Sequence, residues 1–138
     1  MSKLTRFGVS LNSELLNKFD NLIEGKGYNN RSEAIRDLIR EEIVSEEWRE
    51  DGKETVGVFS LVYDHHKNDL SQVLNNIQHN NLNLIRSSTH VHIDHHNCLE
   101  VIIMKGKSSE IKKITDLLSS TKGIKHGKLI TTSTGSDL

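Results

Sequence analysis

The sequence predicts an α+β protein in two parts, a βαα segment followed by a βαββαβ segment. Apolar residues alternate over residues 5–11 and then recur at helical spacing over residues 13–48. The charge changes at the junction, because residues 1–40 hold seven Lys/Arg and five Asp/Glu, whereas residues 41–52 hold six acids and one Arg. Strand and helix patterns then alternate over residues 54–132. We therefore expect domains at residues 1–48 and 54–138, joined by a linker at residues 49–53.

The first domain begins with a strand over residues 5–11, whose alternate side chains Phe7, Val9 and Leu11 form an apolar face. A helix follows Asn12 and Ser13, both good N-cap residues, and ends at Gly25 to Gly27. The second helix begins with Asn30-Arg31-Ser32-Glu33, which has capping-box spacing, and runs to about Trp48. Because about 45 residues with one strand cannot pair that strand or bury both helices, we expect a dimer.

Two paired strands would form an antiparallel ribbon that fits the major groove of double-stranded DNA. The outward side chains of this ribbon are Arg6, which can donate two hydrogen bonds to guanine, and Ser10, while Gly8 permits close approach. The start of the second helix offers a phosphate site, made by backbone N–H groups near Asn30, Arg31 and Ser32 and by the charges of Arg31 and Arg36. A solvated helix face and a dimerisation arm without DNA remain alternatives.

The second half contains the order βαββαβ. We expect strands at residues 54–63, 84–93, 98–105 and 128–132, and helices at residues 69–78 and 108–120. This order matches the ferredoxin-like motif, which carries its helices on one face of a four-stranded sheet and leaves the other face free for a partner subunit.

The hairpin between the second and third of these strands carries potential metal ligands. His90 and His92 project to one side of a strand, and a loop over residues 93–97 would place His92 opposite Cys98 and His90 opposite Glu100. Three ligands leave the shell incomplete, so a fourth would come from elsewhere in the chain, for which His79 is a candidate, from water or from a partner subunit. The alternative is a polar strand with chance histidines and a small core cysteine.

Nitrogen and sulfur donors favour nickel, copper or zinc over calcium and magnesium. One cysteine excludes an internal disulfide, and a thiolate ligand is safer in a reducing compartment. No apolar run approaches the roughly 20 residues of a membrane-spanning helix, and residues 1–6 lead into no signal-peptide core. We therefore expect a cytoplasmic protein without a membrane partner.

Two stretches resemble a known family. Residues 6–11 and 27–37 resemble a ribbon-helix-helix repressor, and His79, His90-Val91-His92 and Cys98-Leu99-Glu100 resemble the nickel-responsive transcriptional regulators of the NikR type across nearly the whole chain. The resemblance implies a ribbon-helix-helix DNA-binding domain and an ACT-like domain that forms homotetramers, as dimers of dimers. It further implies a repressor without enzymatic activity, which binds palindromic operator DNA when nickel(II) is present and controls nickel uptake genes.

The resemblance also implies roles for individual residues. His90, His92 and Cys98 would bind one nickel(II) per subunit, and His79 would be donated by a neighbouring subunit. Glu100 would orient a ligand imidazole; its alternative is a surface charge. Matching positions assign base contacts to Arg6, Gly8 and Ser10, a phosphate contact to Lys67 in addition to those expected of Asn30, Arg31 and Arg36, and a second cation to Glu33 and Asp37 between the two domains. For Glu33 and Asp37, an ordinary solvated pair is equally compatible with the sequence.

The remaining histidines are His65, His66, His95, His96 and His126, for which loop positions without a ligand role are favoured over weaker metal sites. Two other functional classes stay open: an ACT-type ribbon-helix-helix regulator with a small-molecule effector, and a metalloenzyme. The sequence contains no nucleophile motif that supports the enzyme.

Overall fold

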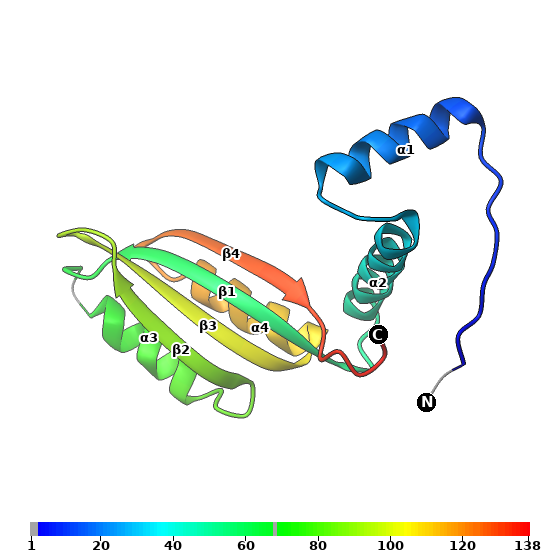
Figure 1. Ribbon diagram of the computed structural model, residues 1–138. Helices are drawn as coiled ribbons and strands as arrows, with labels where there is room; N and C mark the ends of the chain where they lie inside the picture. Colours follow the sequence, from blue (N-terminus) through cyan, green and yellow to red (C-terminus); the bar gives the residue numbers. More distant parts are fainter. Residues whose placement is uncertain (1–2, 68) are drawn as a thin grey trace. The chain divides into compact units, whose positions relative to one another are not determined.

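The computed structural model describes residues 3–67 and 69–138 (Figure 1). The chain divides into two compact units, the first ending at Glu41 and the second running from Glu42 to Leu138. The division lies inside a helix, so the two units share one continuous element. None of the helices among the described residues is long and apolar enough to cross a membrane.

The first unit contains α1 (Ser13–Gly25) and the start of α2 (Arg31–Arg49). The Asn12 side chain accepts a hydrogen bond from the Leu15 N–H at 2.8 Å, and the Asn30 side chain accepts one from the Glu33 N–H at 2.9 Å. These bonds satisfy N–H groups that lack partners at a helix start. Both predicted N-caps are confirmed. Gly27, at φ +85°, follows α1 in the left-handed region that glycine tolerates.

Residues 5–11 form no strand in the single chain. A strand requires a hydrogen-bonding neighbour, and we predicted that this neighbour is a second copy of the same segment. The apolar face is accordingly open: Phe7 is 70% exposed and Val9 is 61% exposed. Together with α1 and α2 of the same unit, residues 4–7 and 9–11 line a largely apolar hollow of about 970 Å³. Apolar surface of this kind on a small unit indicates an interface.

The second unit is built on a four-stranded antiparallel sheet in the order β2-β3-β1-β4. The strands are β1 (Glu54–Asp64), β2 (Ile85–His92), β3 (Asn97–Lys107) and β4 (Ile124–Thr132). Two helices complete the unit, α3 (Leu70–His79) and α4 (Ser108–Ser119). The predicted βαββαβ order is confirmed; β4 begins four residues earlier than predicted, because polar Lys125 and His126 hide the start of the strand from an apolar pattern.

The core lies between one face of the sheet and both helices. Alternate residues of β1 and β3 point into it, including Phe59, Leu61 and Ile102, all at most 1% exposed. They pack with apolar side chains of α3 and α4, namely Leu70, Leu74, Ile111, Ile114 and Leu118. Burial of this surface is the main favourable term in folding of the unit.

The opposite face of the sheet has no covering element within the described chain. Val58 of β1 pairs with Ile103 of β3 and Ile130 of β4, so the three side chains share this face. Ile103 and Ile130 are 39% and 57% exposed. An apolar sheet face of this kind is suited to a partner subunit.

The C-terminal end of α2 belongs to the second unit. The Trp48 indole N–H donates a hydrogen bond to the Thr132 carbonyl at 2.8 Å, and Lys112 donates one to the Trp48 carbonyl at 3.2 Å. The indole ring is buried and packs beside Gly57, where an added Cβ would lie 3.4 Å from it. These contacts attach the end of α2 to β1, β4 and α4.

Candidate metal centre

The hairpin formed by β2 and β3 places the histidines and the cysteine as predicted. His92 pairs with Cys98, and His90 pairs with Glu100. The turn is closed by a hydrogen bond from the Ile93 N–H to the Asn97 carbonyl at 2.9 Å, and the Asp94 carboxylate accepts the N–H groups of His96 and Asn97. These N–H donors lower the pKa of Asp94 to about 2.

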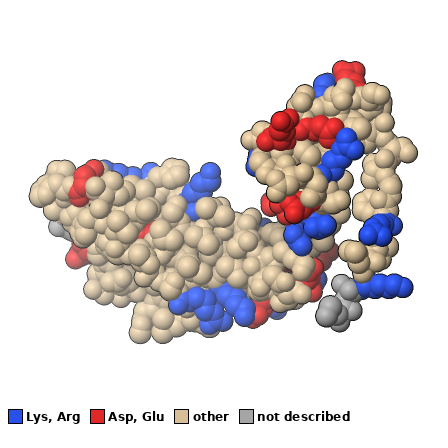
Figure 2. Space-filling view, in the orientation of Figure 1, with Lys and Arg blue, Asp and Glu red and all other residues tan. Residues whose placement is uncertain are grey.

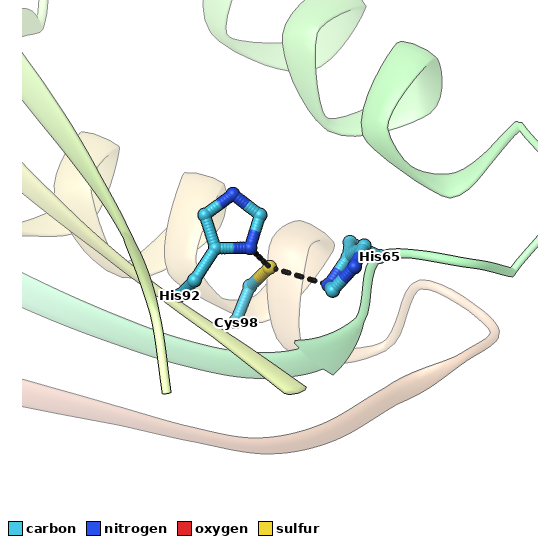
Figure 3. A group of neighbouring side chains, drawn as sticks. All are labelled: His65, His92 and Cys98. Atoms are coloured by element: carbon cyan, nitrogen blue, oxygen red, sulfur yellow. Dashed lines mark hydrogen bonds between the residues drawn. The ribbon is translucent and has the colours of Figure 1, made fainter. Parts of the chain in front are cut away.

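Three side chains converge at the closed end of this hairpin: His65, His92 and Cys98 (Figure 3). Their ligand atoms all lie within 4.8 Å of one another. The Cys98 sulfur is 3.0 Å from His65 Nδ1 and 3.7 Å from His92 Nδ1. Within residues 3–67 and 69–138, no other group of three or more such ligands is this close.

His65 reaches this group through the pairing of β1 with β3. Tyr63 of β1 lies opposite Cys98, so the chain that leaves β1 passes directly over the hairpin. The His65 N–H then donates to the His96 carbonyl at 3.1 Å, which holds the two loops together. Sequence reasoning did not assign His65 a ligand role. In the sequence, His65 stands two residues after Tyr63. This position points to Cys98 only when it is known that Tyr63 pairs with Cys98.

Burial controls the protonation of the group. It raises the pKa of the Cys98 thiol, and the nearby Asp64 carboxylate adds to this effect. Burial also lowers the pKa of His65, with further contributions from the imidazoles of His66 and His92. A neutral imidazole can bind a metal through its nitrogen. The thiol can bind through its sulfur after losing its proton. The two nitrogens and one sulfur fit a late first-row divalent ion, including nickel.

His90 lies beside His92, with ring centres 5.3 Å apart, but its Nδ1 approaches the Tyr63 hydroxyl at 3.4 Å. That hydroxyl donates to the Glu100 carboxylate at 3.0 Å. Burial and Glu100 raise the pKa of Tyr63, so the hydroxyl keeps its proton and remains a donor. Tyr63 therefore orients His90, which lies next to the group of His65, His92 and Cys98 and does not belong to it.

Glu100 is buried, at 4% exposure, and joins several elements. Besides the Tyr63 bond, its carboxylate accepts hydrogen bonds from Ser88 of β2 at 3.1 Å and from the Gln78 amide of α3. The surface-charge alternative for Glu100 is therefore wrong, because the side chain points into the core. Its contact with Gln78 connects α3 to the hairpin at the residue next to His79.

His79 is the last residue of α3 and is exposed. Helix α3 begins after the His65 loop and ends before β2, so within one chain His79 lies at the other end of the helix from that loop. It does not belong to the group around Cys98.

The residues predicted to contact DNA lie on the first unit, except for Lys67. Arg6, Gly8 and Ser10 are exposed in the segment before α1. Arg31 makes a two-bond ion pair with Asp20, with both distances 2.8 Å, and this pair lowers the pKa of Asp20. Arg36 is exposed and lines the same hollow as Arg6.

Two further predictions concern exposed side chains. Lys67 follows β1, and its backbone N–H donates to the Asp64 carbonyl at 3.1 Å. Asp37, one turn after Glu33, accepts a hydrogen bond from the Tyr28 hydroxyl at 2.6 Å and lies 3.5 Å from Arg40. Figure 2 shows acidic and basic side chains interspersed over α1 and α2. Attraction to DNA would therefore depend on individually placed side chains rather than on a uniformly basic face.

Comparisons with known proteins agree with both halves of the chain. Residues 5–46 match the ribbon-helix-helix proteins of the copG family, and residues 56–132 match the NikR C-terminal nickel binding domain. Proteins named "Putative nickel-responsive regulator" from Nitratidesulfovibrio vulgaris (Miyazaki F) and Geobacter sulfurreducens are 53% and 54% identical to this chain, over 100% of it and 99% of their own length. One from Pyrococcus furiosus is 55% identical over 98% of both chains.

Among solved structures, an uncharacterized protein from Thermotoga maritima has a similar fold, with a TM-score of 0.52. The match covers 57% of this chain and 98% of that one, at 12% sequence identity. At this identity the likeness concerns the fold alone.

Proposed function

The chain belongs to the family of nickel-responsive transcriptional regulators, with a ribbon-helix-helix segment and a nickel-binding C-terminal domain, and from this premise we propose that it is a repressor. Nickel binding would enable it to hold palindromic operator DNA, and the genes it controls would serve nickel uptake. The family is one of regulators and not of enzymes. The observation that carries the proposal is the convergence of imidazole nitrogens on the Cys98 sulfur in the same chain as a DNA-binding segment.

We propose His90, His92 and Cys98 of one subunit, with His79 of a second subunit, as the ligands of one nickel ion per subunit. The pairing of His92 with Cys98 and of His90 with Glu100 supports the three ligands of one chain, because all face the same side of the hairpin. The exposed position of His79 at the end of α3 supports its donation to another subunit. In the single chain, His65 occupies the place beside Cys98 that an incoming ligand would take.

Glu100 gives the metal site a route to α3. Its carboxylate holds Tyr63, which orients His90, and also holds Gln78, the neighbour of His79. A change in the position of the hairpin ligands therefore changes the environment of the α3 helix in the same chain, whose His79 would be the fourth ligand of another subunit's site. Ordering α3 in this way would restrict the assembly to arrangements that fit two operator half-sites, which is a population shift.

The DNA-binding surface would form when two chains pair their segments at residues 5–11. The unpaired backbone and the exposed Phe7 and Val9 support this pairing. Arg6, Gly8 and Ser10 would then line the side of the ribbon that faces the bases. We assign phosphate contacts to Asn30, Arg31, Arg36 and Lys67. We retain Glu33 and Asp37 as a second cation site.

The assembly that follows is a homotetramer, a dimer of dimers. One contact is the ribbon of the first unit. The other is the apolar sheet face that carries Val58, Ile103 and Ile130. With His79 donated by another subunit, each nickel site would be complete only in the assembled protein.

Titration of the purified full chain with Ni²⁺ tests the ligand set. We expect one nickel per chain and a sulfur-to-nickel charge-transfer band, both lost in Cys98→Ala and kept in His126→Ala. His126 is a suitable control because it is an exposed histidine on β4 outside the group. Nickel-dependent selection of sites from random double-stranded DNA then tests regulation. If the same DNA sites are selected without nickel and by Cys98→Ala, the proposal is contradicted and a different effector is indicated.

A mixing experiment tests the donated ligand. Cys98→Ala chains keep His79, and His79→Ala chains keep Cys98, so neither alone can form a complete site. If His79 comes from another subunit, mixed assemblies contain complete sites, and part of the charge-transfer band returns after the two variants are unfolded and refolded together. If all ligands belonged to one chain, mixing would restore nothing.

A further inference from the structure

The connection between α2 and β1 is fastened to the start of α4. Residues 50–53 make this connection. The Ser108 hydroxyl donates a hydrogen bond to the Glu50 carbonyl at 3.4 Å, and the Ser109 N–H donates one to the Asp51 carboxylate at 3.3 Å. Hydrogen bonding by Ser109 also lowers the pKa of Asp51. The connection is therefore held by the first residues of a helix that belongs to the second unit.

The contacts between α2 and α4 satisfy a helix end on each side. Lys107 stands at the N-cap position of α4, and an ammonium cannot accept a hydrogen bond, so Asp51 supplies the acceptor that an N-cap residue normally provides. In return, the Lys112 ammonium of α4 donates to the Trp48 carbonyl at 3.2 Å, in the last turn of α2, where carbonyls lack partners within the helix. An anion at a helix N-terminus and a cation at a helix C-terminus are both stabilised by the helix dipole.

Trp48 anchors the same region in the core. Its side chain is 5% exposed, and the indole N–H donates to the Thr132 carbonyl of β4 at 2.8 Å. The Lys112 ammonium lies 6.0 Å from the ring centre, within the range of a cation–π attraction. Lys112 therefore contacts Trp48 through both the backbone and the ring.

Strand β1 connects this anchor to the metal centre. Gly57, near the start of β1, makes room for the indole: an added Cβ would lie 3.4 Å from the Trp48 ring and 3.0 Å from Ile111. Tyr63, near the end of the same strand, pairs with Cys98. One central strand thus runs from the packing of Trp48 to the residues around the thiol.

We propose that residues 48–53 are a locked junction, which makes the end of α2 move with the second unit and so transmits to α2 the restriction that nickel imposes on that unit. Lys112 and Asp51 are its positioning residues, because they act through α2 and α4 and are not among the proposed nickel ligands or DNA contacts. Helix α2 is one continuous element over Arg31–Arg49, so its locked last turn and its first turn, which we assign to phosphate, belong together. The transmission rests on the proposed function; the lock itself does not.

Tryptophan fluorescence tests the lock in the metal-free full chain. Trp48 is the single tryptophan, so its emission reports this one position. We expect weak quenching by acrylamide in the wild-type protein, and stronger quenching with a red-shifted emission in Lys112→Met/Asp51→Ala. Both of these side chains are exposed, so the double variant leaves the core residues in place, and circular dichroism checks the fold. Lys112→Arg/Asp51→Asn keeps a donor and an acceptor and should restore the wild-type quenching.

Nickel and DNA titrations test the transmission, with DNA selected in the presence of nickel. The double variant Lys112→Met/Asp51→Ala should keep the nickel affinity and the charge-transfer band of the wild type, because it alters no proposed ligand. The gain in DNA affinity on adding nickel should fall by about 2–30-fold, which corresponds to the effect of substitutions between coupled sites. Lys113→Met, which changes an exposed lysine of the same helix, is the matched control and should keep the full gain.

Equal quenching of Trp48 in the wild type and in Lys112→Met/Asp51→Ala would overturn the lock. A full nickel-dependent gain in DNA affinity in that variant would overturn the transmission, as would a nickel affinity that falls by the same factor as the gain. Failure of the proposed function gives a different result: nickel leaves the DNA affinity of the wild-type chain unchanged. The transmission is then refuted as well, while the quenching of Trp48 still decides whether the junction is locked.

Discussion

At the scale of single residues, Cys98 shows why a metal ligand can also be a core residue. Its side chain is fully buried, and this burial raises the pKa of the thiol. A buried thiol is protonated in neutral solution and inert until a metal competes with its proton. The imidazole of His65 at 3.0 Å is a neighbour that can receive this proton.

The raised pKa predicts how nickel binding depends on pH. Because the thiol is protonated below its pKa and must lose that proton to bind, nickel affinity should rise with pH by about tenfold per unit for each proton released. We expect nickel affinity to fall about tenfold from pH 7 to pH 6, because the Cys98 thiol must release its proton to bind. Competition with a chelator of known nickel affinity measures this change in nickel affinity. A flat profile would mean that Cys98 is not a ligand.

At the scale of elements, Glu100 is the point where β1, β2, β3 and α3 meet. Its carboxylate accepts from Tyr63, Ser88 and Gln78, and 4% exposure leaves little water to replace them. Hydrogen bonds to charged groups contribute about 1.5–3 kcal/mol each, and an unsatisfied buried partner is costly. The hairpin and α3 are therefore joined by a polar contact that depends on one side chain.

Glu100→Gln should weaken this junction. The amide offers one acceptor oxygen and an NH₂ group that faces other donors, so we expect the free energy of unfolding to fall by about 1–3 kcal/mol. Nickel affinity should fall by about tenfold, because Tyr63, which orients His90, loses the carboxylate that holds it. Urea unfolding at fixed protein concentration and nickel titration measure the two effects. Glu41→Gln, an exposed change on α2, should alter neither; equal effects of both substitutions would show that Glu100 has no special role.

At the scale of the whole molecule, the two units need partners for different surfaces. Among the described residues, none pairs with residues 5–11 as a strand, and none covers the sheet face with Ile103 and Ile130. Both surfaces are apolar, so both can be satisfied by further copies of the chain. Because the proposed fourth ligand comes from another subunit, assembly and metal binding are linked.

Linkage between nickel and DNA must act in both directions. If nickel tightens operator binding by a given factor, the operator must tighten nickel binding by the same factor. Such couplings typically amount to about 5–150-fold. We expect this equality when nickel affinity is measured with and without DNA selected in the presence of nickel, using a scrambled duplex of equal length as control. An operator that leaves nickel affinity unchanged would mean that the two events are not coupled at equilibrium.

The sequence by itself determined the features that depend on local spacing. Asn12 and Asn30 cap α1 and α2 as their positions predict, and the short loop before Cys98 sets the pairing of His92 with Cys98. The βαββαβ order follows from apolar periodicity for the same reason: each pattern is complete within about a dozen residues. Recognition of the family rested on these same local motifs.

Only the tertiary structure decided which distant side chains meet. His65 reaches Cys98, 33 residues away, because β1 pairs with β3 in the centre of the sheet. Glu100 is buried because α3 packs over the hairpin, and residues 5–11 form no strand in the single chain, where the partner we propose is absent. Strand order and packing depend on contacts between residues far apart in the sequence, and the spacing of apolar residues does not reveal these contacts. The neighbours of Cys98 are therefore a property of the folded chain, although each of them is visible in the sequence.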